Sequence, residues 1–228
     1  MKVSIIIPVF NEKNTILEIL RKIDNQKLKD IEKEIIIVDD CSTDGTRDIL
    51  NKLERKYKII YHEKNKGKGG ALTTGYKYAS GEIILNQDAD LEYNPNDYQK
   101  LLDPILKNET KVVYGSRMLG HHINMYSLHF FGNKFLSLAT NIIYACKVTD
   151  METGYKVFRK EVIDGMNLKA NKFDFEPEIT AKILKRGYKI IEVPIDFTNP
   201  RTFSQGKKIT WKDGVKHFIY LLKYRFSN

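Results

Sequence analysis

The stretch EIIIVDDCSTDGTRDIL, residues 34–50, contains the unit that decides the fold. Its apolar run at residues 34–38 has the length of a strand and lacks polar alternation, which is typical of a strand buried on both faces. An acidic loop follows, and apolar residues then return at the spacing of one helix face, at Ile49, Leu50 and Leu53. We therefore expect a strand, a loop and a helix in immediate succession.

The same unit recurs through the first half of the chain. The expected strands are residues 3–7, 34–38, 58–61, 82–85 and 111–114, and helical spacing is found around residues 16–23, 49–53, 71–78 and 97–106. Alternation at this pace predicts an α/β fold with a Rossmann-like, mostly parallel sheet that is covered by helices on both faces.

The regular alternation of expected strands and helices ends after residue 115. A long, mostly apolar helix is expected over residues 128–145, and an irregular stretch comes after it. The next helix, residues 177–186, is expected to have Pro177 at its first position and Gly187 just after its end. The remaining expected elements are a strand at residues 189–193 and a last helix at residues 211–226.

Length and composition favour a single domain over residues 1–228. The two cysteines, Cys41 and Cys146, cannot form a framework of bridges, and they fit a reducing cytoplasm at least as well as any other compartment. The apolar start of the chain meets Pro8 too early for a signal peptide. Because no apolar run of about 18 residues is free of charge, we expect no membrane span.

The formal net charge of +9 fits nucleic acid, an anionic membrane surface or phosphorylated substrates as partners, or it merely keeps the protein soluble. A nucleic-acid-binding module would want aromatic and basic residues interleaved on an exposed surface. The acidic loops argue against that class, so we expect no nucleic-acid partner.

Polar and glycine-rich loops follow the expected strands, at the edge where an open parallel sheet binds its ligands. These loops are residues 8–12, 39–46, 65–70, 86–90 and 115–117. Helix capping explains one such loop, but five converging loops predict a site. The loop at residues 65–70 combines glycines with lysines, yet it matches neither a P-loop nor GxGxxG, so alone it predicts only a flexible helix start.

Asp88 and Asp90 are separated by one residue at the mouth of the strand expected at residues 82–85. In an extended chain their carboxylates project the same way, and Glu92 could extend the row. Their mutual repulsion is offset most simply by a hard divalent cation, which takes oxygen ligands. Asp-x-Asp also occurs in solvated turns, but the buried strand before it favours a metal site.

Eight motifs, in order along the chain, resemble glycosyltransferase family 2 and, within it, the dolichyl- and polyprenyl-phosphate sugar synthase branch. They are IIIPVFNE, VDDCSTDGT, NKGKGGALTTGYKYASGE, NQDADLE, YGSR, DMETGYKVFRKEV, FEPEITAKILKRGYKIIEVPI and PRTFSQGKKITWKDG. The resemblance covers residues 3 to about 225. It implies a GT-A fold, an inverting mechanism, Mg²⁺ or Mn²⁺ as cofactor, and a nucleotide-diphosphate sugar as donor.

Carried over position by position, the resemblance divides the chain into a nucleotide-sugar-binding half, residues 1–117, and an acceptor-binding half, residues 118–228. It places Pro8, Val9, Asn11, Glu12, Asp39, Asp40, Lys68, Asp88 and Ala89 around the nucleotide sugar. It assigns the metal to Asp88 and Asp90, with Glu92 as a third ligand at a position where the branch often has glutamine. It implies catalytic roles for Asp90, Arg117 and Arg201, and acceptor-phosphate contacts for Arg117, Arg201, Lys207 and Lys208. Cys41 stands where the family commonly has glycine.

The implied reaction transfers a hexose to a polyprenyl (dolichyl or undecaprenyl) phosphate. Such an acceptor needs cations but no general base, because the second pKa of a monophosphate is about 6 and its oxygen is already anionic at neutral pH. A hydroxyl acceptor on a glycan would need a base, for which Asp150 and Glu152 are the candidates. That alternative stays open, as does a sugar-1-phosphate nucleotidyltransferase, which also uses paired acidic residues.

The last expected helix is amphipathic. Val215, Phe218, Ile219, Leu222 and Phe226 share one face, and Lys212, Lys216, Lys223 and Arg225 flank it. Such a helix can dock on the core or lie in a membrane interface. Because the implied acceptor is a membrane lipid, we expect a cytoplasmic protein in peripheral contact with the cytoplasmic membrane face.

Overall fold

The computed structural model describes residues 1–120, 127–170, 174–197 and 211–227. Within them, seven strands form one sheet, in the order β3-β2-β1-β4-β6-β5-β7. The strands are β1 (Lys2–Val9), β2 (Glu32–Asp39), β3 (Lys58–Tyr61), β4 (Ile83–Asn86), β5 (Val112–Ser116), β6 (Lys156–Arg159) and β7 (Ile190–Pro194). All neighbours pair in parallel except β6, which is antiparallel to both β4 and β5. The predicted mostly parallel sheet is confirmed.

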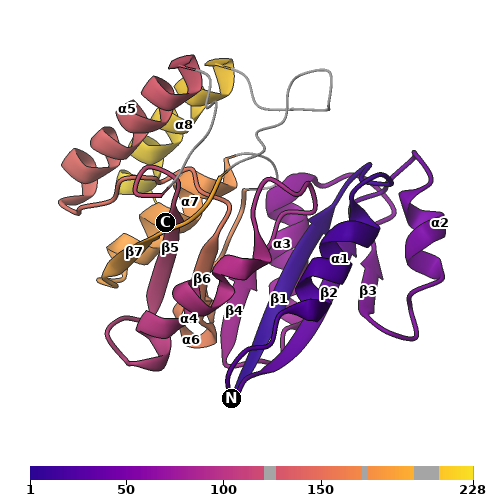
Figure 1. Ribbon diagram of the computed structural model, residues 1–228. Coiled ribbons are helices and arrows are strands. Elements are labelled where there is room, and N and C mark those ends of the chain that lie inside the picture. The colour runs from indigo at the N-terminus through magenta and orange to yellow at the C-terminus, as the bar shows by residue number, and fades with distance from the viewer. Residues whose placement is uncertain (121–126, 171–173, 198–210, 228) are drawn as a thin grey trace.

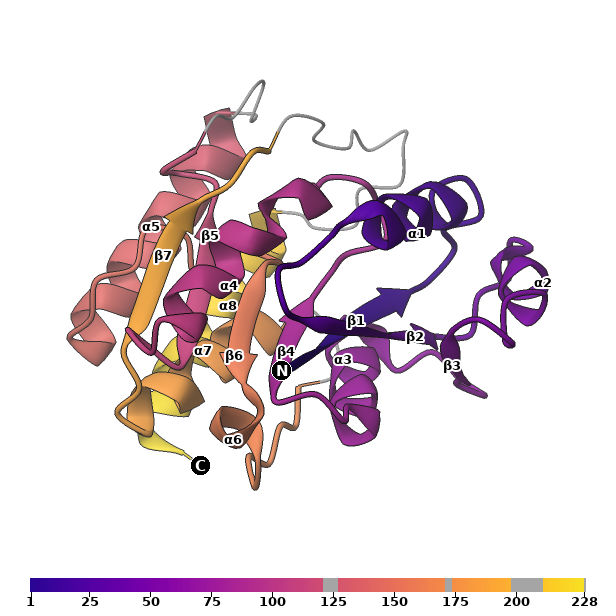
Figure 2. The same cartoon turned by 60° about the horizontal axis from the view of Figure 1, so that its bottom comes forward.

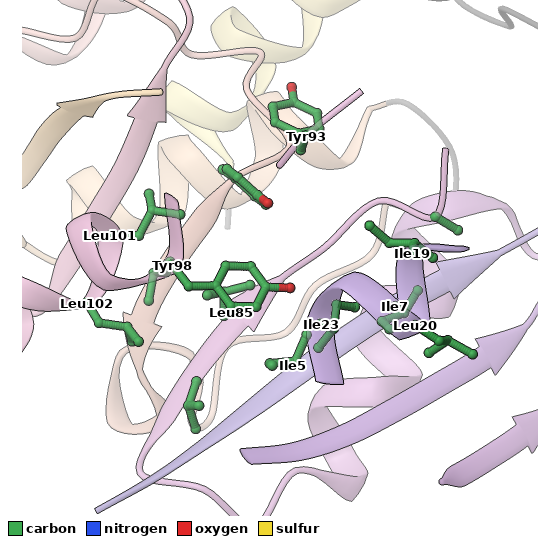
Figure 3. Close-up of a cluster of buried hydrophobic side chains, with 14 of the residues drawn as sticks. Ile5, Ile7, Ile19, Leu20, Ile23, Leu85, Tyr93, Tyr98, Leu101 and Leu102 are labelled. Carbon is green, nitrogen blue, oxygen red and sulfur yellow. The ribbon is translucent and has the colours of Figure 1, made fainter. Parts of the chain in front are cut away.

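Helices cover both faces of this sheet (Figures 1 and 2). On one face, α1 (Ile16–Asn25), α2 (Thr46–Asn51) and α4 (Tyr98–Leu106) bury their apolar sides, and α4 follows the short 3₁₀ helix Pro95–Asp97. Figure 3 shows Ile19, Leu20 and Ile23 of α1 packed towards Ile5 and Ile7 of β1. Removal of this apolar surface from water is the main force that holds the layers together.

The opposite face is covered by α3 (Gly67–Tyr78), α6 (Lys160–Ile163) and α7 (Phe175–Lys185). The helices α5 (Ser127–Tyr144) and α8 (Trp211–Phe226) lie side by side and pack against α7 (Figure 1). Tyr144 of α5 donates a hydrogen bond from its hydroxyl to the carbonyl of Leu221 in α8, 2.8 Å away. Each of these two helices therefore keeps one side away from the sheet.

Two details differ from the predictions. The strand β6 lies in the stretch expected to be irregular, because only Val157 and Phe158 of its four residues are apolar, too few for a pattern. The helix α7 begins at Phe175, so Pro177 is its third residue rather than its first. Proline is tolerated there because the backbone N–H groups of a first turn have no intrahelical partner. Gly187, with φ of +78°, follows the end of α7 as predicted.

Across the ranges that the structure describes, no helix is long and apolar enough to cross a membrane.

Candidate active site

The carboxyl ends of β1, β2, β4 and β5 open onto one edge of the sheet, and the loops that follow them meet there. The loops after β1 and β2 are linked by hydrogen bonds. Asn11 N–H donates to Ser42 Oγ at 2.9 Å, and Glu12 N–H donates to Thr46 Oγ1 at 2.9 Å. For these two loops, the predicted convergence is confirmed.

Four of the residues predicted to contact the nucleotide sugar lie at the end of β1 or just after it. Pro8 and Val9 are paired with β2 in the sheet. Asn11 is exposed and adopts a left-handed φ of 59°, while its side-chain oxygen accepts from Thr43 N–H at 2.8 Å. Glu12 is buried, and its carboxylate accepts from Thr15 Oγ1 at 2.7 Å. Asn11 is the one of these four whose side chain is exposed at the site edge; its contact with a nucleotide stays a prediction.

Asp39 and Asp40 are both buried and both engaged by protein groups. Arg47 donates to Asp39 Oδ2 from Nε at 2.8 Å. Asp40 accepts from His62 Nδ1–H at 2.7 Å and from the backbone N–H groups of Lys66 and Gly67 at 2.8 and 2.7 Å. Since Gly67 begins α3, Asp40 satisfies the free N–H groups of that helix start and orders the loop at residues 65–70.

Arg47 and His62 were not among the predicted residues. Neither belongs to a motif, and no spacing links them to the carboxylates they bind. The donor contacts expected of Asp39 and Asp40 stay predictions, because their carboxylates already have protein partners.

Asp88 and Asp90 follow β4, and both are partly exposed at this edge. The sequence predicted an extended chain at this point, but Ala89 and Asp90 form a turn and Leu91 has φ of +66°. The turn is held by a hydrogen bond of 3.2 Å from Glu92 N–H to Asp90 Oδ1. The simple argument that i and i+2 side chains project together therefore does not apply here.

The described ranges contain no group of three or more His, Cys, Asp or Glu side chains arranged to hold a metal ion. Glu92 thus gains no support as a third ligand. Two carboxylates still fit Mg²⁺ or Mn²⁺ at a diphosphate site, since such ions keep water and take substrate phosphate oxygens for their other positions.

Lys68 and Asp88 form an ion pair at the centre of the site. The Nζ of Lys68 lies 2.8 Å from Asp88 Oδ1 and 3.4 Å from Glu176 Oε1. Burial acts to lower the pKa of Lys68, but the two carboxylates outweigh it, and the pKa is raised above the ordinary value. Lys68 therefore remains a cation beside the predicted metal ligand, where it can also meet phosphate.

Arg117 is bound tightly by Asp150. Its Nε and Nη2 each donate to a different oxygen of Asp150 at 2.7 Å, and its backbone N–H donates to Oδ2 at 3.0 Å. The Asp150 side chain is 0% exposed and that of Arg117 is 11% exposed. Both oxygens of Asp150 are thus engaged, which argues against Asp150 as a general base. Burial opposes the charge of Arg117, but Asp150 raises its pKa well above the ordinary value.

The segment at residues 149–156, which ends at the first residue of β6, contacts both of these ion pairs. A Cβ at Gly154 would lie 2.4 Å from Asp88 Oδ2, so any larger residue would displace that carboxylate. The Gly154 N–H donates to Tyr93 Oη at 2.8 Å. Lys156, which is fully buried, donates to the carbonyls of Met151 and Thr153 and to Glu176. One loop therefore sets the places of Asp88, Asp150 and Arg117.

The two cysteines are unbridged. Cys41 adopts φ of +66°, which is the physical reason why glycine suits this position. Burial raises the pKa of Cys146 to about 11, so its thiol is protonated near neutral pH. Arg201, Lys207 and Lys208 lie outside the described residues, and their predicted roles stay predictions.

Sequence comparison with known proteins identifies the family of this chain. Residues 4–165 match the model of glycosyl transferase family 2. The chain is 34% identical to the dolichol-phosphate mannosyltransferase of Pyrococcus furiosus, over 98% of this chain, and it spans 64% of the length of that protein. It is 31% identical to the UDP-N-acetylglucosamine–dolichyl-phosphate N-acetylglucosaminyltransferase of Methanococcus voltae, over 99% of this chain and 96% of that one.

Among solved structures, the chain is similar in fold to glucosyl-3-phosphoglycerate synthase from Mycobacterium tuberculosis, crystallised with Mn²⁺, UDP-glucose and phosphoglyceric acid. The TM-score is 0.74 and the identity 18%, over 98% of this chain and 79% of that one. The similarity confirms the predicted GT-A fold. The family match and the identity to the Methanococcus voltae relative show that this chain belongs to glycosyl transferase family 2.

Proposed function

We propose that this chain is an inverting, metal-dependent glycosyltransferase that moves a hexose from a nucleotide-diphosphate sugar to a polyprenyl phosphate. The loops after β1, β2 and β4 form the donor side, and Arg117 after β5 lies on the acceptor side. An oxygen of the acceptor phosphate attacks the anomeric carbon in line with the bond to the diphosphate. That bond breaks, and the nucleotide diphosphate leaves with the electron pair.

Asp88 and Asp90 are the residues that we expect to hold Mg²⁺ or Mn²⁺. The ion, when bound, supplies charge that stabilises the leaving diphosphate. Lys68 adds a fixed cation beside Asp88, 2.8 Å away. The solved structure of similar fold, glucosyl-3-phosphoglycerate synthase, was crystallised with Mn²⁺ and UDP-glucose, which supports a divalent ion in the proposed reaction.

Three observations favour a phosphate acceptor over a hydroxyl. Two relatives are named for dolichyl-phosphate substrates. Asp150, one of the two candidates for a general base, has both oxygens engaged by Arg117. Arg117 itself keeps N–H groups beyond those bound to Asp150, because a guanidinium carries five donors. With Arg201, Lys207 and Lys208, it is our candidate for binding the acceptor phosphate.

The observation that carries the lipid acceptor is the exposed apolar surface of α5 and α8, which we call the α5/α8 face. On α5 it consists of Phe131, Phe135, Leu138 and Ile142, and on α8 of Val215, Ile219, Leu222 and Phe226. The α5 residues recur at helical spacing along one side, and Ile142 is 73% exposed. Exposed apolar side chains that gather on neighbouring helices are typical of a site of interaction.

Basic residues flank the α5/α8 face. Lys134 lies on α5, and Lys216, Lys223 and Arg225 lie on α8. Near an anionic lipid surface, each contributes about 1 kcal/mol. Apolar side chains that enter the headgroup region, with cations around them, are typical of helices that lie in the membrane interface. We therefore place the protein in peripheral contact with the cytoplasmic face of a membrane.

The test is a donor-by-acceptor panel with radiolabelled GDP-mannose, UDP-glucose and UDP-N-acetylglucosamine, each with Mn²⁺. Acceptors are dolichyl phosphate, undecaprenyl phosphate and free glycans. Lipid-soluble product, extracted into organic solvent, is the expected result, with a rate that rises through the acceptor's ionisation at pH about 6. Water-soluble product from a glycan alone would instead establish a hydroxyl acceptor. Release of pyrophosphate from a sugar 1-phosphate and a nucleoside triphosphate would establish a nucleotidyltransferase.

A further inference from the structure

Glu152 lies in the segment at residues 149–156, between the residues that contact Asp88 and Arg117. Two residues before it, Asp150 binds Arg117, and two residues after it, Gly154 lies against Asp88. The side chain of Glu152 is 9% exposed. Glu152 is also close enough to Arg117 to contribute to the raised pKa of that guanidinium, although less than Asp150 does. Its carboxylate therefore belongs to the same electrostatic environment as the site.

The two oxygens of Glu152 have different surroundings. Oε2 accepts a hydrogen bond from Nδ1–H of His217, 2.8 Å away, in α8. Oε1 is buried and, within the part of the chain that the structure describes, has no hydrogen-bond partner. Buried polar atoms in native proteins nearly always have a hydrogen-bond partner. A carboxylate oxygen without one beside an active site therefore indicates that a bound ligand supplies the partner.

The chemistry of that partner is restricted. A carboxylate only accepts hydrogen bonds, so the ligand atom must carry a proton. Phosphate oxygens of the donor and of the acceptor are anionic and would be repelled. In the proposed reaction, the substrate groups that offer neutral donors near Asp88 and Arg117 are the hydroxyl groups of the transferred sugar.

We propose that Glu152 is a specificity-determining residue, whose Oε1 accepts a hydrogen bond from a hydroxyl group of the sugar being transferred. This inference rests on the proposed glycosyltransferase function but not on the identity of the acceptor. The interaction selects donors because a buried polar group is left unpaired when the matching hydroxyl is missing or has the other configuration.

His217 acts as a positioning residue. It is 2% exposed, on the inner side of α8, while Val215 and Ile219 of the same helix are exposed. By donating to Oε2, it fixes the carboxylate and leaves Oε1 for the ligand. The sugar pocket thus depends on a residue from the C-terminal helix, 65 positions away in the sequence.

The test measures donor binding by calorimetry with Mn²⁺ and without acceptor. GDP-mannose, UDP-glucose and UDP-N-acetylglucosamine are compared with GDP and UDP, which lack the sugar. For the preferred nucleotide sugar, Glu152→Ala is expected to weaken binding about 10- to 100-fold, while binding of the nucleotide diphosphate changes less than about twofold. Glu152→Gln, which keeps one carbonyl oxygen, should recover part of the affinity. Glu161→Gln, an exposed carboxylate at the start of α6, is the matched control.

Deoxy donors identify the hydroxyl group. One deoxy analogue of the preferred sugar should bind wild type and Glu152→Ala equally weakly, whereas the other analogues should still lose affinity in the variant. Equal weakening of nucleotide sugar and nucleotide diphosphate, or unchanged binding of both in a folded Glu152→Ala variant, would overturn the proposal. Intact sugar-dependent donor binding without transfer to any polyprenyl phosphate would refute the proposed acceptor and leave this inference standing.

Discussion

Removing the cation of Arg117 is expected to affect stability as well as catalysis, and the structure sets the size of the effect. Arg117 makes three hydrogen bonds to Asp150, whose side chain is 0% exposed. Arg117→Met leaves that carboxylate buried and without its charge partner. Breaking a buried ion pair by removing one partner costs about 3–5 kcal/mol. Since a chain of this length loses roughly 2–4 °C per kcal/mol, the Tm should fall by roughly 6–20 °C.

A double-mutant cycle separates this effect from acceptor binding. Asp150→Asn removes the uncompensated charge but keeps an oxygen that can accept from the backbone N–H of Arg117. The double variant Arg117→Met/Asp150→Asn should therefore recover most of the lost stability, measured by urea and thermal unfolding. It should remain impaired in transfer, with a raised KM for polyprenyl phosphate and a lower kcat, because the cation is still missing. The reasoning is refuted if the changes in unfolding free energy of the two single variants add up to that of the double variant, with a coupling energy below about 0.5 kcal/mol.

Four further outcomes are expected. Asp90→Ala should abolish turnover while the Tm stays near wild type, and Mn²⁺ should no longer raise the Tm in the presence of nucleotide diphosphate; unimpaired transfer would end the assignment of Asp90 as a metal ligand. Gly154→Ala should lower kcat at least about tenfold, because its Cβ would lie 2.4 Å from Asp88 Oδ2; Gly132→Ala, which meets nothing within 4 Å, is the control, and equal activity of the two variants would contradict the role of Gly154. Phe131→Asp/Ile142→Asp should reduce sedimentation with phosphatidylserine vesicles by at least about tenfold at an unchanged Tm, since each apolar side chain contributes roughly 1.5–3 kcal/mol when fully buried; undiminished sedimentation would rule out the α5/α8 face as the membrane contact. Asp40→Ala should destabilise the protein by about 1–3 kcal/mol, because the N–H groups at the start of α3 and His62 lose their acceptor; calorimetry with GDP and UDP on the folded fraction then shows whether Asp40 also contributes to donor affinity.

Local patterns in the sequence determined much of the fold. The uninterrupted apolar run before Asp39 identifies β2 as a buried strand, because only a strand covered on both faces excludes polar residues. Helix ends were equally readable where glycine permits a left-handed backbone, as at Gly187. The placing of Asp88 and Asp90 at the ligand-binding edge also followed, since the carboxyl ends of parallel strands share one edge of a sheet.

The tertiary structure alone decided how the site is assembled. The strand β6 is too short to give a recognisable pattern in the sequence. It forms because β4 and β5 pair with it on both sides. Its antiparallel insertion brings Gly154 against Asp88 and Asp150 against Arg117, contacts that join residues 66 and 33 positions apart. Asp40 proved to be a helix cap, and Glu152 a carboxylate with one oxygen held by His217 and the other without a partner in the described structure. Periodicity reports the environment of one segment, whereas a hydrogen bond depends on where two distant segments meet, and only the sheet order decides that.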